Sequence, residues 1–303
     1  MPGSRRRRRA TGAAVAAVLV VGAGATAGVV WFLDRMDTPS VARCAAELDG
    51  TSWYLTPDQA QNASLIVGTA VQRGLPARAA TIGLATALQE SRLINIDYGD
   101  RDSVGLFQQR PSQGWGTVDE IMDPVYSTGK FYDGLVEVEG YEDLEVTVAA
   151  QAVQRSAFPE AYAQHETRSR AWASALGGHS PGAVTCELPP PGDTDPAADA
   201  PAGAEARAVL AERATRDLGL PADAVRAADG VEGNAVVVDP SAVPLEAELA
   251  TWALAHWAVA TAEVTGAQEV RAGDRSWSRE DGAWQAVDDD GRRPDGQVTI
   301  VLS

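Results

Sequence analysis

Hydrophobic residues recur at helical spacing through residues 51–186, and local start and stop patterns divide this stretch into helices. A Thr-Pro-Asp-Gln capping box at 56–59 predicts a helix that runs to about Arg73, where a glycine supplies the stop. Pro76 opens a second apolar helix, which we expect to end near Ser91.

The same rules predict the helices that follow. A Thr-Val-Asp-Glu capping box at 117–120 opens one helix, and an Asp-Pro pair at 123–124 opens the next. Two more helical patterns cover about 144–155 and 158–176. No alternating strand pattern interrupts them, so we expect residues 51–186 to form a mainly α domain.

The pattern changes beyond a linker rich in proline and aspartate at 187–203. The elements predicted after it are a helix at 204–217, a β-like run at 234–239, a helix at 245–264, and short strands at 268–271, 276–278, 283–285 and 298–302. These predict a small α+β domain at 204–303. It carries no catalytic constellation, and binding of an envelope protein is one role that we consider for it.

The N-terminal end predicts a membrane anchor. Residues 10–33 form an uncharged apolar segment of 24 residues, which suffices to cross about 30 Å of bilayer at about 1.5 Å per residue. The tail at 1–9 contains five consecutive arginines, so the positive-inside rule places it in the cytoplasm. We therefore expect a single-pass protein of the cell membrane, with a stalk at 34–50 and the bulk of the chain outside. Small residues at 23–27 also fit a cleaved signal peptide, which would make the protein secreted.

The net charge and the cysteines limit the classes of function that the chain can have. The chain of 303 residues has a formal net charge of −17, which argues against nucleic-acid binding because that needs a basic face. The only two cysteines, Cys44 and Cys186, bracket most of the helical region. Outside the cytoplasm such a pair favours a disulfide, worth up to ~5 kcal/mol in the chain-entropy model; two separate buried thiols are the alternative. No Cys or His spacing fits a metal site, and we expect neither metal nor cofactor.

The candidate chemistry begins with Glu90, at the end of the second apolar helix. A carboxyl group there retains its proton near neutral pH, because desolvation and the negative end of the helix dipole both disfavour its ionised form. Such a group suits glycosidic-bond cleavage, which needs an acid to protonate the leaving oxygen. The alternative is an ordinary surface glutamate beside a turn.

Polar and aromatic neighbours of this glutamate fit a sugar ligand. Ser91 can hydrogen-bond the carboxyl group or sugar hydroxyls, and Gln108 and Gln109 offer amides suited to N-acetyl groups. Trp115 lies in a glycine-rich loop, where its ring is available to stack on a sugar. We therefore predict that these four residues bind substrate.

Two blocks of sequence together resemble the lysozyme-like superfamily, and most nearly the lytic transglycosylases of peptidoglycan. That family places its catalytic glutamate in a Glu-Ser-x-x-x-Asn-like helix end, followed by a Gly-Leu-Met/Phe-Gln turn. Here Glu90-Ser91 and the Gly-Leu-Phe-Gln sequence at 105–108 match, and Asn95 lies close to the family's asparagine.

The resemblance covers about residues 50–176. Segments 109–116 and 153–162 are similar to an actinobacterial extracellular branch of the superfamily. One departure is the Ala-Gln-Ala-Val-Gln sequence at 150–154, which replaces the Ala-Tyr-Asn-Ala-Gly segment common in transglycosylases. That replacement puts the family's substrate contacts at this segment in doubt.

The resemblance implies a mainly α lysozyme-like domain that cleaves the β-1,4 bond between N-acetylmuramic acid and N-acetylglucosamine in peptidoglycan strands. Glu90 would act as acid and then as base. Asp97, Asp100 and Asp102 offer a second base for a hydrolase, or else form an acidic solvated loop. Two further hypotheses stay open: a non-catalytic glycan-binding scaffold, and an envelope protein whose C-terminal domain is the functional part.

Overall fold

The computed structural model describes residues 42–156, 159–189, 203–228, 234–288 and 296–303. The expected basic tail, the apolar segment at 10–33 and the stalk up to residue 41 lie outside these ranges. None of the helices within the described ranges is both long enough and apolar enough to cross a membrane. Residues 42–303 form one compact unit.

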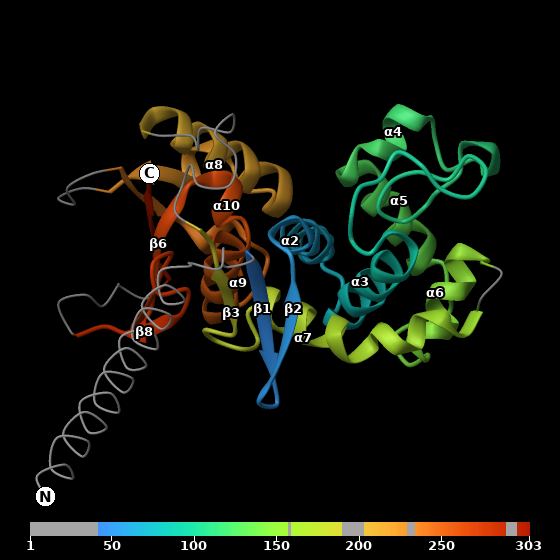
Figure 1. Cartoon of the computed structure of the whole chain (residues 1–303), viewed down its shortest axis with the longest axis horizontal. Coiled ribbons are helices and arrows are strands. Elements are labelled where there is room, and N and C mark those ends of the chain that lie inside the picture. The colour runs from blue at the N-terminus through green and yellow to red at the C-terminus, as the bar shows by residue number, and fades with distance from the viewer. Residues whose placement is uncertain (1–41, 157–158, 190–202, 229–233, 289–295) are drawn as a thin grey trace, which may run out of the picture. The chain divides into compact units, whose positions relative to one another are not determined.

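The predicted helices of the first region are present. They are α2 (Pro57–Gln72), α3 (Ala77–Ser91), α4 (Val118–Met122), α5 (Pro124–Val136), α6 (Val146–Gln154) and α7 (Glu166–Leu176), with short 3-10 turns η1 (Pro111–Gln113) and η2 (Pro159–His165). Both capping boxes form, at Thr56 for α2 and at Thr117 for α4. The almost wholly buried α3 packs against α2, α5, α6 and α7 (Figure 1), so its C-terminal end is held from several sides.

A three-stranded antiparallel sheet in this region was not predicted. Its strands are β1 (Arg43–Leu48), β2 (Thr51–Leu55) and β3 (Val184–Glu187), in the order β2-β1-β3. The expected stalk at 34–50 is therefore corrected at its C-terminal part, which pairs into the folded unit as β1. The reason is long-range: β1 and β3 pair with Cys44 opposite Cys186, and these two cysteines form the predicted disulfide.

The C-terminal region is the α+β arrangement that the sequence predicts. Its elements are α8 (Gly203–Leu218), η3 (Ala222–Ala224), β4 (Val225–Ala227), β5 (Ala235–Val238), η4 (Pro240–Ala242), α9 (Ala247–Ala260), α10 (Ala262–Thr265), β6 (Ala267–Ala272), β7 (Arg275–Ser278), β8 (Trp284–Ala286) and β9 (Val298–Leu302). The strands form one antiparallel sheet in the order β4-β5-β9-β6-β7-β8.

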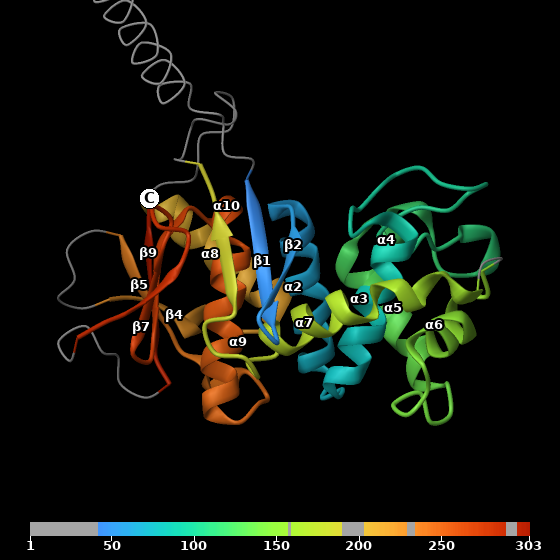
Figure 2. The ribbon, with the colours of Figure 1, turned by 60° about the horizontal axis from the view of Figure 1, so that its bottom comes forward.

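The two regions share one continuous hydrophobic core. Helix α9 is apolar on all sides and accordingly buried, since it packs on β6 and β9 as well as on α2, α7 and β3 (Figure 2). Helices α2 and α8 approach so closely that a Cβ on Gly68 would lie 2.1 Å from the backbone oxygen of Asp217. The same oxygen accepts a hydrogen bond of 2.8 Å from the amide of Gln72. The C-terminal region thus supports the helices that carry the candidate site.

Candidate active site

Glu90 lies in the last turn of α3, where the chain reverses through two left-handed residues, Arg92 and Leu93. Its side chain is half-buried, and Tyr162 donates a hydrogen bond of 2.6 Å to its Oε1. The Gln154 side chain is a second polar neighbour that favours the ionised carboxyl group. Burial raises the pKa of Glu90, and Tyr162 and Gln154 oppose that rise only in part. The group therefore holds its proton at a higher pH than an exposed glutamate does.

Tyr162 comes from the 3-10 turn η2 and is fully buried. Desolvation, followed by the negative charge of Glu90, raises the pKa of Tyr162 far above its usual range. The hydroxyl consequently stays protonated and donates to the glutamate. The turn η2 also contacts α3 at Gln89, the residue before Glu90. The side chains of Gln164 and His165 each lie 3.1 Å from the Gln89 side-chain oxygen.

The turn at 105–108 packs directly against the end of α3. Gly105 has φ +80°, and a Cβ there would lie 2.8 Å from the backbone oxygen of Ile121, so only glycine fits without displacement. Leu106 and Phe107 are fully buried, and Phe107 stacks on Phe131 with 4.6 Å between ring centroids. The turn therefore contributes apolar side chains to the core next to the end of α3.

Three of the predicted substrate-binding residues donate hydrogen bonds to backbone oxygens of the protein itself. The buried Ser91 hydroxyl donates to the Leu106 oxygen at 2.7 Å. Gln109, only 1% exposed, donates to the Ser127 oxygen at 3.0 Å. Gln108 donates to the Tyr98 oxygen at 3.2 Å. This geometry favours a positioning role for Ser91 and Gln109 over the direct ligand contact that the sequence suggested.

Trp115, the fourth of these residues, lines a groove of about 560 Å³. The groove is also lined by Gln113, Gly134, Glu137, Ala152, Val153, Gln154 and Arg155. Gln154 relates the groove to the acid, because its side chain stabilises the ionised form of Glu90, while its Nε2 donates to the Phe107 oxygen at 2.7 Å. A polymer lying along Trp115 would thus meet a side chain that neighbours the candidate acid.

Sequence reasoning missed several of these groups. The sequence did not single out Tyr162, Gln154, Glu137 or Arg155 as site residues. Gln154 shares one local feature with Glu90: both lie in the last turn of a helix that ends at a left-handed arginine, Arg155 after α6 and Arg92 after α3. Nothing local indicates that the two helix ends meet.

In the acidic loop at 97–102, the carboxylate of Asp102 has a structural role. Asp102 pairs with Arg110 at 2.7 Å and accepts a hydrogen bond of 2.8 Å from the Ser112 backbone nitrogen. These contacts hold the pKa of Asp102 well below its usual range, so its carboxylate is a poor proton acceptor for a catalytic base. Asp97 and Asp100 are exposed. The loop therefore fits the acidic solvated alternative better than a catalytic one.

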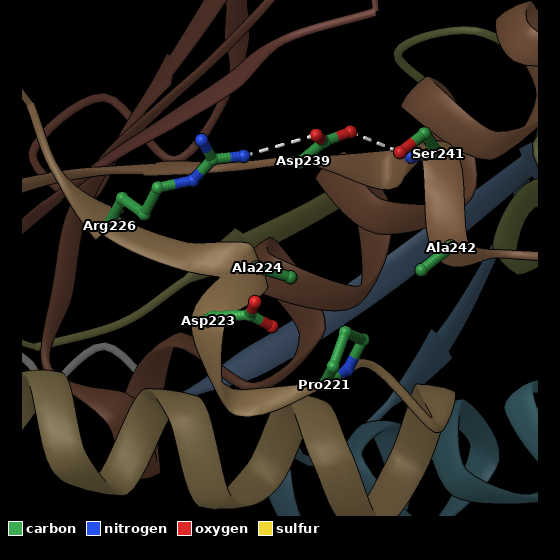
Figure 3. A pocket seen from close by; sticks show the side chains of 7 residues that line it. All are labelled: Pro221, Asp223, Ala224, Arg226, Asp239, Ser241 and Ala242. Carbon is green, nitrogen blue, oxygen red and sulfur yellow. Dashed lines mark hydrogen bonds and ion pairs between the residues drawn. The ribbon is translucent and has the colours of Figure 1, made fainter.

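A second hollow, of about 340 Å³, lies in the C-terminal region beside η3 and η4 (Figure 3). Its charged groups are largely engaged with each other, since Arg226 pairs with Asp239 at 3.2 Å and Asp239 accepts from the Ser241 nitrogen at 2.9 Å. Among the described residues, no group of three or more His, Cys, Asp and Glu side chains is placed to hold a metal ion. The groove beside Glu90 is therefore the stronger candidate for chemistry.

Comparison with known proteins adds no family to this picture. The chain matches no protein-family model, and no curated protein matches it. The functional assignment consequently depends on the geometry around Glu90 and on the resemblance of residues 50–176 described above.

Proposed function

We propose that the chain is a cell-wall enzyme that cleaves the β-1,4 bond between N-acetylmuramic acid and N-acetylglucosamine, with Glu90 as its acid and base. One observation carries the proposal. A half-buried carboxyl group with a raised pKa accepts a hydrogen bond from Tyr162, and its second polar neighbour, Gln154, also lines an open groove. Catalytic acids are found in such environments, where burial and a specific partner shift the pKa together.

The proposed reaction begins with protonated Glu90. It transfers its proton to the glycosidic oxygen as the bond to the anomeric carbon breaks, and the glutamate becomes a carboxylate. Tyr162 stabilises that carboxylate through its hydrogen bond, and the neighbouring Gln154 side chain also favours the ionised form. Glu90 then recovers a proton from the nucleophile that attacks the anomeric carbon.

Two nucleophiles are compatible with this scheme. Attack by the C6 hydroxyl of the muramic acid closes an anhydro ring, which is the lytic transglycosylase outcome and requires no second carboxylate. Attack by water leaves a reducing end, which is the lysozyme-type outcome. Because Asp102 is ion-paired, the loop at 97–102 supports a dedicated water-activating base poorly.

The proposed location follows from the N-terminal sequence. An anchor at 10–33 would leave residues 42–303 on the outer face of the cell membrane, where peptidoglycan strands lie. The disulfide between Cys44 and Cys186 supports a compartment outside the cytoplasm. Cleavage of the segment as a signal peptide would give the same enzyme in secreted form.

The test is turnover of purified peptidoglycan by the wild-type protein and by Glu90→Gln, with release of soluble muropeptides as the measurement. We expect the substitution to abolish release, because the amide cannot donate a proton to the glycosidic oxygen. Glu248→Gln is the matched control, since Glu248 is exposed in the first turn of α9. Equal inactivity of wild type and Glu90→Gln, with retained binding to insoluble peptidoglycan, would favour the glycan-binding scaffold instead.

A further inference from the structure

Two opposite charges line the groove that contains Trp115. Glu137 directly follows α5, and Arg155 directly follows α6 in a left-handed conformation with φ 52°. Both side chains are exposed. Within the described part of the chain, neither forms an ion pair or a side-chain hydrogen bond. The groove therefore presents a carboxylate and a guanidinium that are both available to a ligand.

The rest of the groove fits a ligand that carries a sugar. Trp115 supplies an aromatic face, and the amides of Gln113 and Gln154 supply donors and acceptors. A glycan without peptides carries only the lactyl carboxylates of its muramic acids and no amine, so Glu137 would have no partner. A ligand with both an amine and a carboxylate would satisfy Glu137 and Arg155.

Peptidoglycan contains such a group beside the bond that we propose is cleaved, because the muramic acid carries a short peptide. We propose that this groove binds the peptide stem, with Arg155 pairing to a stem carboxylate and Glu137 to a stem amine. This inference rests on the proposed function for the identity of the substrate. It assigns to the site a preference for peptide-bearing glycan over glycan without peptides.

Charge argues against a polyanionic wall polymer as the occupant. Such a polymer would gain from Arg155 but would be repelled by Glu137 and by a chain whose formal net charge is −17. A stem carries both an amine and carboxylates, so it offers an attractive partner to each of the two groove charges. A guanidinium and a carboxylate form paired hydrogen bonds, so we expect Arg155 to bind a stem carboxylate.

The test measures binding rather than turnover, by calorimetry with the full-length Glu90→Gln protein in detergent micelles. The probes are a soluble GlcNAc-MurNAc disaccharide carrying a tetrapeptide with a side-chain amine and, as the bare disaccharide, the same sugar with its lactyl carboxylate amidated and no peptide. We expect the peptide-bearing probe to bind at least tenfold more tightly. Arg155→Gln and Glu137→Gln, each added to Glu90→Gln, should weaken its binding about tenfold and leave the bare disaccharide unchanged.

Modified probes assign each charge to its partner. Acetylating the stem amine should remove the effect of Glu137→Gln, and amidating the stem carboxylates should remove the effect of Arg155→Gln. Arg170→Gln is the control, since Arg170 is exposed on α7 outside the groove. The proposal would be overturned if the two probes bound with equal affinity or if neither bound. It would also be overturned if Arg155→Gln and Glu137→Gln weakened the binding of both probes equally. A peptide preference without turnover by the wild type would instead retain the stem site and reject the cleavage reaction.

Discussion

The hydrogen bond from Tyr162 to Glu90 gives the most informative single perturbation of the site. Tyr162→Phe removes a donor that lies 2.6 Å from Oε1 and keeps the buried ring in place. The hydrogen bond favours the ionised carboxylate and so lowers the pKa of Glu90 against the effect of burial. Its loss should therefore raise that pKa further. A hydrogen bond to a charged group contributes about 1.5–3 kcal/mol, which corresponds to about 1–2 pKa units at about 1.4 kcal/mol per unit.

The assay is the pH profile of kcat/KM for glycan cleavage. Glu90 must be protonated at the start of the reaction, so activity is lost as the pH rises through its pKa. We expect Tyr162→Phe to move this alkaline limb upward by about 1–2 pH units and to lower the maximal rate, because the carboxylate that forms is less stabilised.

A matched control separates this effect from a general loss of stability. Tyr132→Phe removes another buried tyrosine hydroxyl, which donates to the Ile66 oxygen at 3.0 Å away from the candidate acid. Tyr132→Phe should lower the free energy of unfolding without moving the alkaline limb of the pH profile. An alkaline limb that stays in place or moves downward in Tyr162→Phe would refute the assignment of Glu90 as the acid that Tyr162 controls.

Three further predictions concern the fold. Gly68→Ala places a methyl group 2.1 Å from a backbone oxygen of α8, and we expect it to lower the free energy of unfolding by about 1–3 kcal/mol in urea denaturation. Gly129→Ala, whose Cβ would have no described neighbour closer than 3.9 Å, should be neutral or stabilising by up to about 1 kcal/mol; equal effects would argue against the close α2–α8 packing. Burial lowers the pKa of His256 to about 4, so its protonation in the unfolded chain should remove about 3 kcal/mol of stability between about pH 6.5 and pH 4. His256→Phe should flatten the dependence of stability on pH in that window, and an unchanged slope would contradict the buried neutral histidine. Reducing the disulfide between Cys44 and Cys186, 142 residues apart, should lower the melting temperature strongly, by an amount equivalent to up to ~5 kcal/mol. An unchanged melting temperature on reduction would show that the closed loop contributes little.

The helices were predictable because the patterns that define them are local. The capping box at Thr56, the N-cap at Asp123 and the apolar spacing of α3 each operate within a few residues. Glu90 was identifiable for the same reason, as a carboxylate at the end of an apolar helix.

Contacts between distant segments were not predictable in the same way. Strands β1 and β3 are short, and their pairing depends on a partner more than a hundred residues away. The hydrogen bond between Tyr162 and Glu90 spans 72 residues of sequence. The groove likewise brings together the ends of α5 and α6 with the loop around Trp115. No hydrophobic periodicity along the chain predicts these contacts between distant segments.

The C-terminal region bears on the competing hypothesis that it alone is functional. Its helices α8 and α9 pack against α2 and α7, and the buried His256 contacts the backbone oxygen of Ala175 at 2.7 Å. Deleting residues 187–303 would expose this shared core. A loss of activity after that deletion would therefore report on folding, and point substitutions at the groove are the better test.

The central claim is that Glu90 cleaves peptidoglycan glycan strands. Mass spectrometry of the muropeptides released from purified peptidoglycan by the full-length protein tests it most directly. We predict disaccharide-containing fragments from the wild type and from Glu248→Gln, with anhydro ends for a transglycosylase or reducing ends for a hydrolase, and none from Glu90→Gln. Intact glycan after incubation with the wild type, or equal release by Glu90→Gln, would contradict the claim.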